Sequence, residues 1–308
     1  MTRYRIEWGP LVVGGIGGSG TRVVAQILTE MGFYLGADLN RALDNLWFTL
    51  LFRRPRWFDA DGDHIPRESR RGYVVMQRAL RGAPLDDDDL EFVRGAVAEL
   101  AGEGRFAVPA ARGRSRRATA GGHYDAEWAR VRYETLSAAH RLAPEQALGW
   151  GWKEPNSHVF LPELAAAFET MRFVLVLRNG LDMAFSDNQQ QLANWGARYG
   201  VAPPSVAADA PRQSLAFWVA ANQRAVDRGE EHLGERFLVL RYEDLCRRPE
   251  VEIARLCDFI GHHPDQKIFE RLVGIPRLTA GIGRFRDEDL TVFDDAHLDV
   301  VRRLGFDT

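Results

Sequence analysis

A cluster of five glycines between an apolar run and a helical pattern constrains this chain more than any other feature. Residues 10–13 read PLVV, and residues 14–20 read GGIGGSG. From Thr21 onward, apolar residues recur at helical spacing, so the order is strand, glycine loop, helix. Such a loop directs several backbone N–H groups toward one point at the positive end of the helix, which predicts an anion site. A plain turn would not require five glycines, because each costs backbone entropy.

Two known nucleotide-binding motifs share part of this loop. A nucleoside-triphosphatase P-loop reads G-x-x-x-x-G-K-[ST]; Gly15 and Gly20 have its spacing, but Thr21 occupies the lysine position, which disfavours a kinase or ATPase. The dinucleotide fingerprint G-x-G-x-x-G is satisfied by Gly15, Gly17 and Gly20, and Asp38 follows at about the distance of a ribose-binding acid. A Rossmann-type NAD(P) or FAD oxidoreductase is therefore an alternative, although the following residues show no second strand-helix-strand unit.

Later in the chain, apolar runs alternate with helical patterns. Residues 173–177 are apolar without interruption and end at Arg178, as expected of a parallel strand covered on both faces. A further strand is expected at 237–240, ending at Arg241. Helices are expected at about 180–195, about 212–230 and 249–260, the last stopped by Gly261. The alternation predicts an α/β fold with a parallel β-sheet flanked by helices, whose ligands lie beyond the carboxyl ends of the strands.

The segment at about 41–148 differs from the rest, because it shows helical periodicity but no convincing strand. It is expected to be a mainly helical insertion. The acidic run 86–89 favours the start of a helix over a metal site, since carboxylates stabilise the positive end of the helix dipole. Residues 102–122 are rich in glycine and arginine and are expected to form a loop. Its arginines could attract an anionic acceptor, although a solvated loop is the simpler interpretation: Arg105, Arg112, Arg114, Arg116 and Arg117.

Composition excludes several classes of partner. The chain has 308 residues and a formal net charge of −3, so nothing in its overall electrostatics predicts binding to nucleic acid. The two cysteines, Cys246 and Cys257, lie in apolar surroundings and are expected to be buried thiols of a reduced compartment. No membrane span is expected, and the protein is expected to be cytoplasmic. The eight histidines show no ligand spacing, so no metal is expected.

Four segments in order resemble the sulfotransferase family that uses 3'-phosphoadenosine 5'-phosphosulfate on a P-loop-like fold. GGIGGSGTRVVAQIL resembles its 5'-phosphosulfate loop, and GWKEPN resembles its lysine-acid-proline element. FVLVLRNGLDMAFS resembles the strand, arginine and serine that hold the 3'-phosphate. LVLRYEDLCRRPEVEIARLCDFIG is the most specific match. The resemblance spans residues 11–36 and 149–261, and it implies one sulfotransferase-like domain over 1–308.

The resemblance implies a set of nucleotide-binding residues. The loop residues that would hold the 5'-phosphosulfate are Gly17, Gly18, Ser19, Gly20 and Thr21, with Arg22 following. Arg178 and Ser186 would hold the 3'-phosphate, and Tyr242 could face the adenine. Arg284 lies in a late basic turn that would close over the nucleotide. Relatives commonly carry Lys or Arg where this chain has Gly18, so the cation expected near the transferred group is missing there.

The resemblance also implies the chemistry. The acceptor hydroxyl or amine would attack sulfur in line while the phosphate oxygen leaves, which requires positioning, leaving-group stabilisation and a base but no metal. Lys153, or Arg22, would supply the missing positive charge. Asp44 and Asp38 are candidate bases, with His158 a further one. Asp38 could instead cap the helix that follows. A carbohydrate or small metabolite is the favoured acceptor class, and a catalytically inactive nucleotide-binding homologue is a second alternative.

Overall fold

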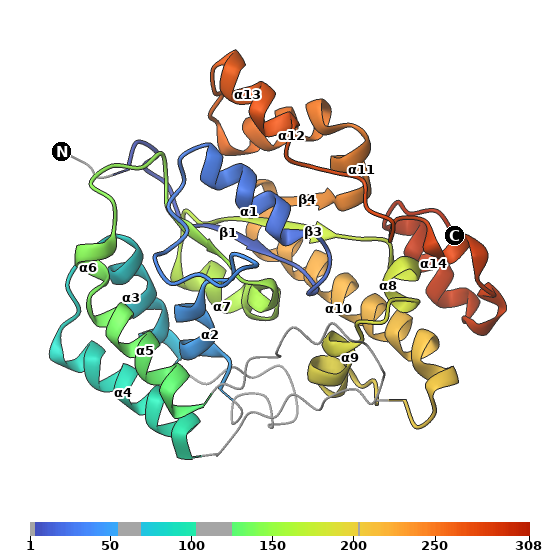
Figure 1. The fold of residues 1–308 in the computed structure, drawn as a ribbon, viewed down its shortest axis with the longest axis horizontal. Coiled ribbons are helices and arrows are strands. Elements are labelled where there is room, and N and C mark those ends of the chain that lie inside the picture. Colours follow the sequence, from blue (N-terminus) through green and yellow to red (C-terminus); the bar gives the residue numbers. More distant parts are fainter. Residues whose placement is uncertain (1–3, 55–68, 103–124, 203) are drawn as a thin grey trace.

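Four parallel strands form the centre of the molecule. In this computed structural model, which describes residues 4–54, 69–102, 125–202 and 204–308, the strands are β1 (Leu11–Gly14), β2 (Gly151–Lys153), β3 (Arg172–Leu177) and β4 (Phe237–Arg241). They pair in the order β2-β1-β3-β4 (Figure 1). All three pairings are parallel, so the predicted α/β fold with a parallel sheet is confirmed.

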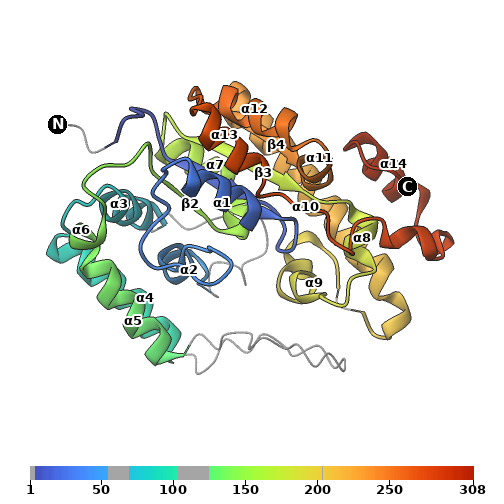
Figure 2. The same ribbon diagram turned by 45° about the horizontal axis from the view of Figure 1, so that its top comes forward.

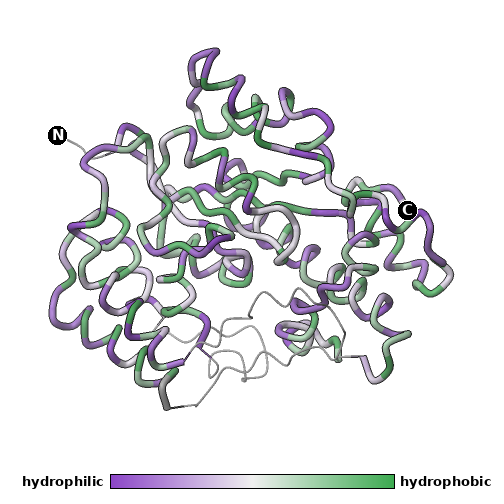
Figure 3. The backbone as a smooth tube through the Cα atoms, viewed as in Figure 1, coloured by the Kyte–Doolittle hydropathy of each residue, from purple (hydrophilic) through white to green (hydrophobic). Residues whose placement is uncertain are grey.

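Alternate residues of β3 point into two different hydrophobic clusters. Phe173 and Leu175 pack into one cluster, and Val174 and Val176 pack into the other. All four side chains are fully buried. The hydropathy colouring in Figure 3 shows a largely apolar centre. This explains why the run is apolar at every position: a strand buried on both faces has no solvent-facing residue.

Helices cover both faces of the sheet. On one face lie α1 (Thr21–Glu30), α11 (Tyr242–Arg247), α12 (Pro249–Ile260) and α13 (Gln266–Val273). On the other lie the 3₁₀ helix η2 (Pro155–Phe160), α7 (Leu161–Ala167) and α10 (Ala210–Leu233). Figure 1 shows α12 and α13 above the strands and α7 and α10 below them. The helix α12 starts at a proline and ends at Gly261 with φ 74°, as predicted.

The described part of the predicted insertion is helical. Its helices are α2 (Leu46–Phe52), α3 (Ser69–Leu80), α4 (Asp87–Gly102), α5 (Ala126–Ser137) and α6 (Ala139–Leu142). Figure 2 shows α3 to α6 gathered at the end of the molecule opposite α14 (Asp295–Arg303). The acidic run does start a helix, α4. Residues 103–122 of the predicted loop, with all five of its arginines, lie outside the described residues.

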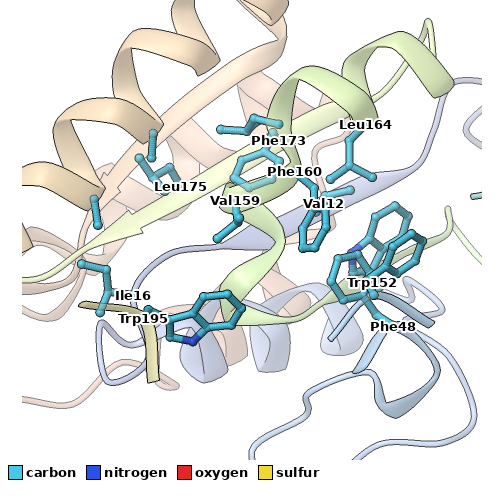
Figure 4. Packing of buried hydrophobic residues seen from close by; sticks show 14 of the residues in the cluster. Val12, Ile16, Phe48, Trp152, Val159, Phe160, Leu164, Phe173, Leu175 and Trp195 are labelled. Carbon is cyan, nitrogen blue, oxygen red and sulfur yellow. The ribbon is translucent and has the colours of Figure 1, made fainter. Parts of the chain in front are cut away.

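Aromatic side chains join this segment to the sheet. Phe48 of α2 packs 5.8 Å from the ring of Trp152 on β2 and 5.7 Å from that of Phe160 in η2 (Figure 4). Phe52 continues the contact to Tyr73 of α3, with ring centroids 4.8 Å apart. Large buried rings contribute much of the apolar area of a core, so α2 is fixed firmly at the end of β2.

One predicted helix was wrong. The segment expected as a single helix at 180–195 is divided into α8 (Gly180–Ala184) and α9 (Gln190–Trp195). The amide of Gln189 donates to the carbonyl oxygens of Met183, Ala184 and Ser186, at 3.3, 3.0 and 2.6 Å. A side chain that satisfies these terminal carbonyls ends α8, because they no longer need the N–H groups of a following turn.

The remaining elements are short. They are the 3₁₀ helices η3 (Gly196–Tyr199), η4 (Ala207–Asp209), η5 (Gly234–Arg236), η6 (Arg284–Asp287) and η7 (Leu290–Val292). Cys246 and Cys257 are free and buried, as predicted. Among the helices of the described residues, none has the length and apolar character needed to cross a bilayer.

The N-cap of α2 provides a test of the fold. Asn45 is fully buried; its Oδ1 accepts from the Phe48 N–H at 3.0 Å, and its Nδ2 donates to the Leu35 carbonyl at 2.9 Å. We expect Asn45→Ala to lower the free energy of unfolding by about 3 kcal/mol, because both partners lose a buried hydrogen bond. Asp265→Ala, at the exposed cap of α13, should cost only about 1 kcal/mol. Urea denaturation of both variants measures the difference; equal losses would contradict this account.

Candidate active site

The glycine loop adopts a conformation that only glycine tolerates well. Gly18 and Gly20 both have φ of 97°, a region that strains other residues. A Cβ at Gly20 would also lie 2.2 Å from the ring of Tyr242. A Cβ at Gly17 would lie 2.4 Å from the amide nitrogen of Gln191 on α9. Gly18 and Gly20 are therefore required by backbone conformation, whereas a side chain at Gly17 would have to displace the flexible end of Gln191.

The loop leads directly into α1. Gly20 is the N-cap of the helix and Thr21 its first residue. Ser19 is only 1% exposed, and Thr21 is also buried, whereas Arg22 is exposed. The first turn of α1 contains no acidic residue, so the helix itself supplies no carboxylate to the positive end of its dipole. The structure thus has the predicted order of strand, glycine loop and helix N-terminus.

Arg178 lies against the glycine loop. Its Nη1 donates to the carbonyl oxygen of Gly18 at 3.3 Å. The guanidinium carbon lies 5.4 Å from the ring centroid of Tyr242, and that ring in turn lies against Gly20. The carboxyl ends of β1, β3 and β4 thus bring together the loop, the arginine and the tyrosine, as expected for neighbouring parallel strands.

The late basic turn reaches the same place. Arg284 begins η6, and a side chain at Gly281 would overlap the guanidinium groups of both Arg178 and Arg284. The Nη1 of Arg284 donates to the carbonyl oxygen of Phe185 at 3.4 Å, beside Ser186. Ser186 lies between α8 and α9, outside the helix that was expected at about 180–195, and its hydroxyl accepts from the Asn188 N–H at 3.3 Å.

Lys153 and Asp44 form an ion pair at the end of β2. Lys153 is only 2% exposed; its Nζ contacts the Asp44 carboxylate and donates to the Ala42 carbonyl at 3.0 Å. Asn40 organises the turn that carries Asp44, since its Oδ1 accepts from the N–H groups of Ala42 and Asp44. Its Nδ2 donates to Asp44 Oδ2 at 2.8 Å. Leu43, in the middle of the turn, has φ 63°, which is uncommon for a residue other than glycine.

Asp38 lies apart from this pair. Its Oδ2 accepts from the Thr135 hydroxyl at 2.6 Å, and its Oδ1 lies 3.5 Å from Arg132, so the carboxylate ties the chain before α2 to α5. The alternative that Asp38 caps the following helix is wrong. Asn45 caps α2.

His158 is buried in η2 below the sheet. Its Nδ1 lies 2.8 Å from the Pro155 carbonyl oxygen, and its Nε2 lies 3.5 Å from the Tyr199 hydroxyl. Burial lowers the pKa of His158 to about 4, so the imidazole is neutral at pH 7. Glu154 was not among the predicted site residues, although it directly follows the last residue of β2, a position that the sequence analysis could have recognised. Burial raises the pKa of Glu154 to about 7, while its oxygens accept from the backbone and side chain of Asn156.

The residues gathered at the strand ends fit a ligand with two anionic groups. Within the described part of the chain, the buried Ser19 hydroxyl has no hydrogen-bond partner, and neither do the buried Nε atoms of Arg178 and Arg284. Buried polar atoms are nearly always satisfied, so these donors indicate a site that a ligand completes. The loop can hold one anion with backbone N–H groups, and the two guanidinium groups can hold another.

The low pKa of His158 leads to a test. The unfolded chain binds a proton near pH 6.5 that the folded chain does not bind until about pH 4. Stability is therefore lost as the pH falls between these values, by about 2 kcal/mol from pH 7 to pH 5. We expect His158→Gln to remove that part of the pH dependence, and His263→Gln, at an exposed histidine, to keep it. Urea unfolding at pH 7 and pH 5 measures the free energy of unfolding at each pH. If His158→Gln lost as much stability between the two as the parent does, the low pKa of His158 would be contradicted.

Comparisons with known proteins found similar chains among the solved structures. The matched solved structures include a sulfotransferase from Mycobacterium avium, at 16% identity and TM-score 0.46 over 98% of this chain and 76% of that one. The sulfotransferase domain of the Synechococcus olefin synthase matches at 15% identity and TM-score 0.47, over 100% of this chain and 98% of that one. A retinol dehydratase solved with androsterone and the inactive cofactor PAP matches at 14% identity and TM-score 0.37, over 98% of this chain and 82% of that one. At these identities and TM-scores, the acceptor of a matched protein is no evidence for the acceptor of this chain.

The search of curated proteins returned no match. The family comparison is decisive, because the model of the sulfotransferase family matches residues 10–265, most of the chain. The Rossmann oxidoreductase alternative is thereby set aside. Together with the parallel α/β fold, this match establishes that the chain belongs to the sulfotransferase family.

Proposed function

We propose that this enzyme takes the sulfuryl group of 3'-phosphoadenosine 5'-phosphosulfate and transfers it to an acceptor hydroxyl or amine by in-line displacement. The observation that supports this most directly is the contact of Arg178 with the carbonyl of Gly18. It puts the loop suited to one phosphate beside the guanidinium suited to another. One nucleotide carrying phosphates on its 3' and 5' oxygens can therefore reach both.

Each end of the donor has its own proposed residues. The amides of Gly17 to Thr21, with the hydroxyls of Ser19 and Thr21, hold the 5'-phosphosulfate, which is supported by the partnerless Ser19 Oγ. Arg178, Arg284 and Ser186 hold the 3'-phosphate. Ser186 directly follows Phe185, whose carbonyl oxygen accepts a hydrogen bond from Arg284. Tyr242 faces the adenine, since its ring lies between the loop and Arg178.

The missing cation has a physical explanation. At φ 97° a lysine at position 18 would be strained, so this loop conformation favours glycine over a basic residue there. We assign the compensating charge to Lys153, which lies at the end of the strand next to the loop. Arg22 is the second choice, because it is exposed on the first turn of α1. A positive charge there stabilises the leaving oxygen as negative charge develops on it.

Asp44 is the proposed base. It is partly exposed, whereas Asp38 is engaged by α5 and His158 is buried. The pair with Lys153 holds its carboxylate at the carboxyl edge of the sheet, and the Asn40 turn fixes its direction. In this role Asp44 takes the proton from the attacking hydroxyl or amine, while Lys153 stabilises the negative charge on the leaving oxygen. The acceptor class that we favour remains a carbohydrate or small metabolite.

Nucleotide selectivity tests the donor assignment. We expect 3'-phosphoadenosine 5'-phosphate to raise the melting temperature, because a ligand that binds only the native state adds about 2.7 kcal/mol at a hundred times its dissociation constant. ATP and NAD should give no comparable shift. Arg178→Ala should lose the shift, since it removes a charge-assisted contact to phosphate. The proposal would be abandoned if the parent did not respond, or if Arg178→Ala responded as the parent does.

The base assignment needs a turnover measurement. With labelled donor and a pool of sugars and small alcohols as acceptors, we expect Asp44→Asn to lower transfer by roughly 10²- to 10⁴-fold. Nucleotide affinity should stay within about threefold, because Asp44 is not proposed to touch the nucleotide. Asp38→Asn is the matched control and should keep most of the transfer. Equal losses in both variants would remove Asp44 from this role, and a parent that binds without any transfer would favour the inactive homologue.

A further inference from the structure

A buried carboxylate on α8 holds the late basic turn. Asp182 is only 1% exposed; its Oδ2 accepts from the Gly283 N–H at 2.8 Å, and its Oδ1 accepts from the Phe285 N–H at 3.3 Å. These are N–H groups at the start of η6, the short helix that begins with Arg284. Asp182 therefore caps η6 from about a hundred residues away and fixes the backbone on both sides of Arg284.

A second buried carboxylate holds the backbone next to Arg178. Glu243 is 6% exposed, and its Oε1 accepts from the Asn179 N–H at 3.0 Å. The indole N–H of Trp218 donates to the carbonyl oxygen of Arg178 itself at 3.0 Å. Asn179 also caps α8, because its side chain accepts from the Leu181 N–H at 2.8 Å. The backbone that carries Arg178 is thus held from two sides.

Asp182 lies on α8, and Glu243 on α11 holds Asn179, the N-cap residue of the same helix. Helix α8 begins two residues after Arg178 and contains Asp182, which binds the turn of Arg284. One short helix therefore fixes the backbone positions of both arginines. Their guanidinium groups meet over Gly281. Two cations repel each other, and burying two carboxylates costs several kcal/mol of desolvation unless their hydrogen bonds compensate. The two buried carboxylates are explained if their task is to hold the guanidinium groups of Arg178 and Arg284 close together despite this cost.

We propose that Asp182 and Glu243 are positioning residues that set the Arg178–Arg284 pair to the spacing of one phosphate group. Neither residue touches the nucleotide in this role. The consequence is specificity: the enzyme distinguishes nucleotides that carry a 3'-phosphate from those that lack it only while both carboxylates hold the pair in register. The inference rests on the proposed function, because it takes the donor's 3'-phosphate as the ligand of the two arginines.

The test compares two nucleotides by calorimetric titration. The ratio of the affinities for 3'-phosphoadenosine 5'-phosphate and for AMP measures recognition of the 3'-phosphate. We expect Asp182→Ala to lower that ratio at least tenfold, with AMP affinity changed less than threefold. Asp182→Asn should lie between this variant and the parent, since one amide oxygen still accepts a hydrogen bond. Glu243→Gln should lower the ratio by a smaller factor, because a neutral amide oxygen is a weaker acceptor for the Asn179 N–H than a carboxylate oxygen.

The control is a carboxylate of similar burial away from the site. Glu252 lies on α12 and pairs with Arg255; Glu252→Gln should leave the ratio unchanged. If the parent itself shows no preference for the 3'-phosphate, the donor proposal fails and this inference fails with it. If the parent discriminates but folded Asp182→Ala keeps the parent ratio, the inference alone is overturned. Should Asp182→Ala not fold, parent ratios in both Asp182→Asn and Glu243→Gln overturn it.

Discussion

The parallel pairing of β1 with β3 is the constraint on which the rest of the site depends. It aligns Gly14 with Leu175, so the glycine loop leaves one strand beside the last residues of the other. Arg178 then reaches the Gly18 carbonyl without any long excursion of the chain. Since β4 lies next to β3, Tyr242 enters the same space. The backbone N–H groups of the loop and the guanidinium group of Arg178, which are proposed to hold two anions, thus become neighbours through the strand order.

Much of this could be predicted from local patterns. The glycine loop, the apolar run of β3 and the proline-started helix α12 each have a short-range signal, and each lies where the sequence indicated. The break between α8 and α9 could not be read in the same way. It depends on the amide of Gln189 turning back onto α8, and the pattern of apolar residues does not reveal which way a side chain turns.

Other features escaped because they depend on contacts between distant parts of the chain. Asp38 has the sequence position of a base, yet Thr135 and Arg132 on α5 give it a structural task. Asp182 has no sequence signal of its own, and its partners lie about a hundred residues away in the late turn. Long-range hydrogen bonds to backbone groups leave no periodicity, so the residues that position a site are harder to find than those that bind.

The two halves of the site are built differently. In the proposed site, the donor half consists of backbone amides and of arginines whose backbones are held by buried carboxylates. The proposed base, Asp44, is held by its pair with Lys153 and by a turn in which Leu43 has positive φ. Strain of this kind costs about 1–3 kcal/mol and persists only where the surroundings impose it. Here the Lys153–Asp44 pair and the Asn40 hydrogen bonds impose it, so the turn that carries the proposed base is fixed to the same edge of the sheet as the glycine loop.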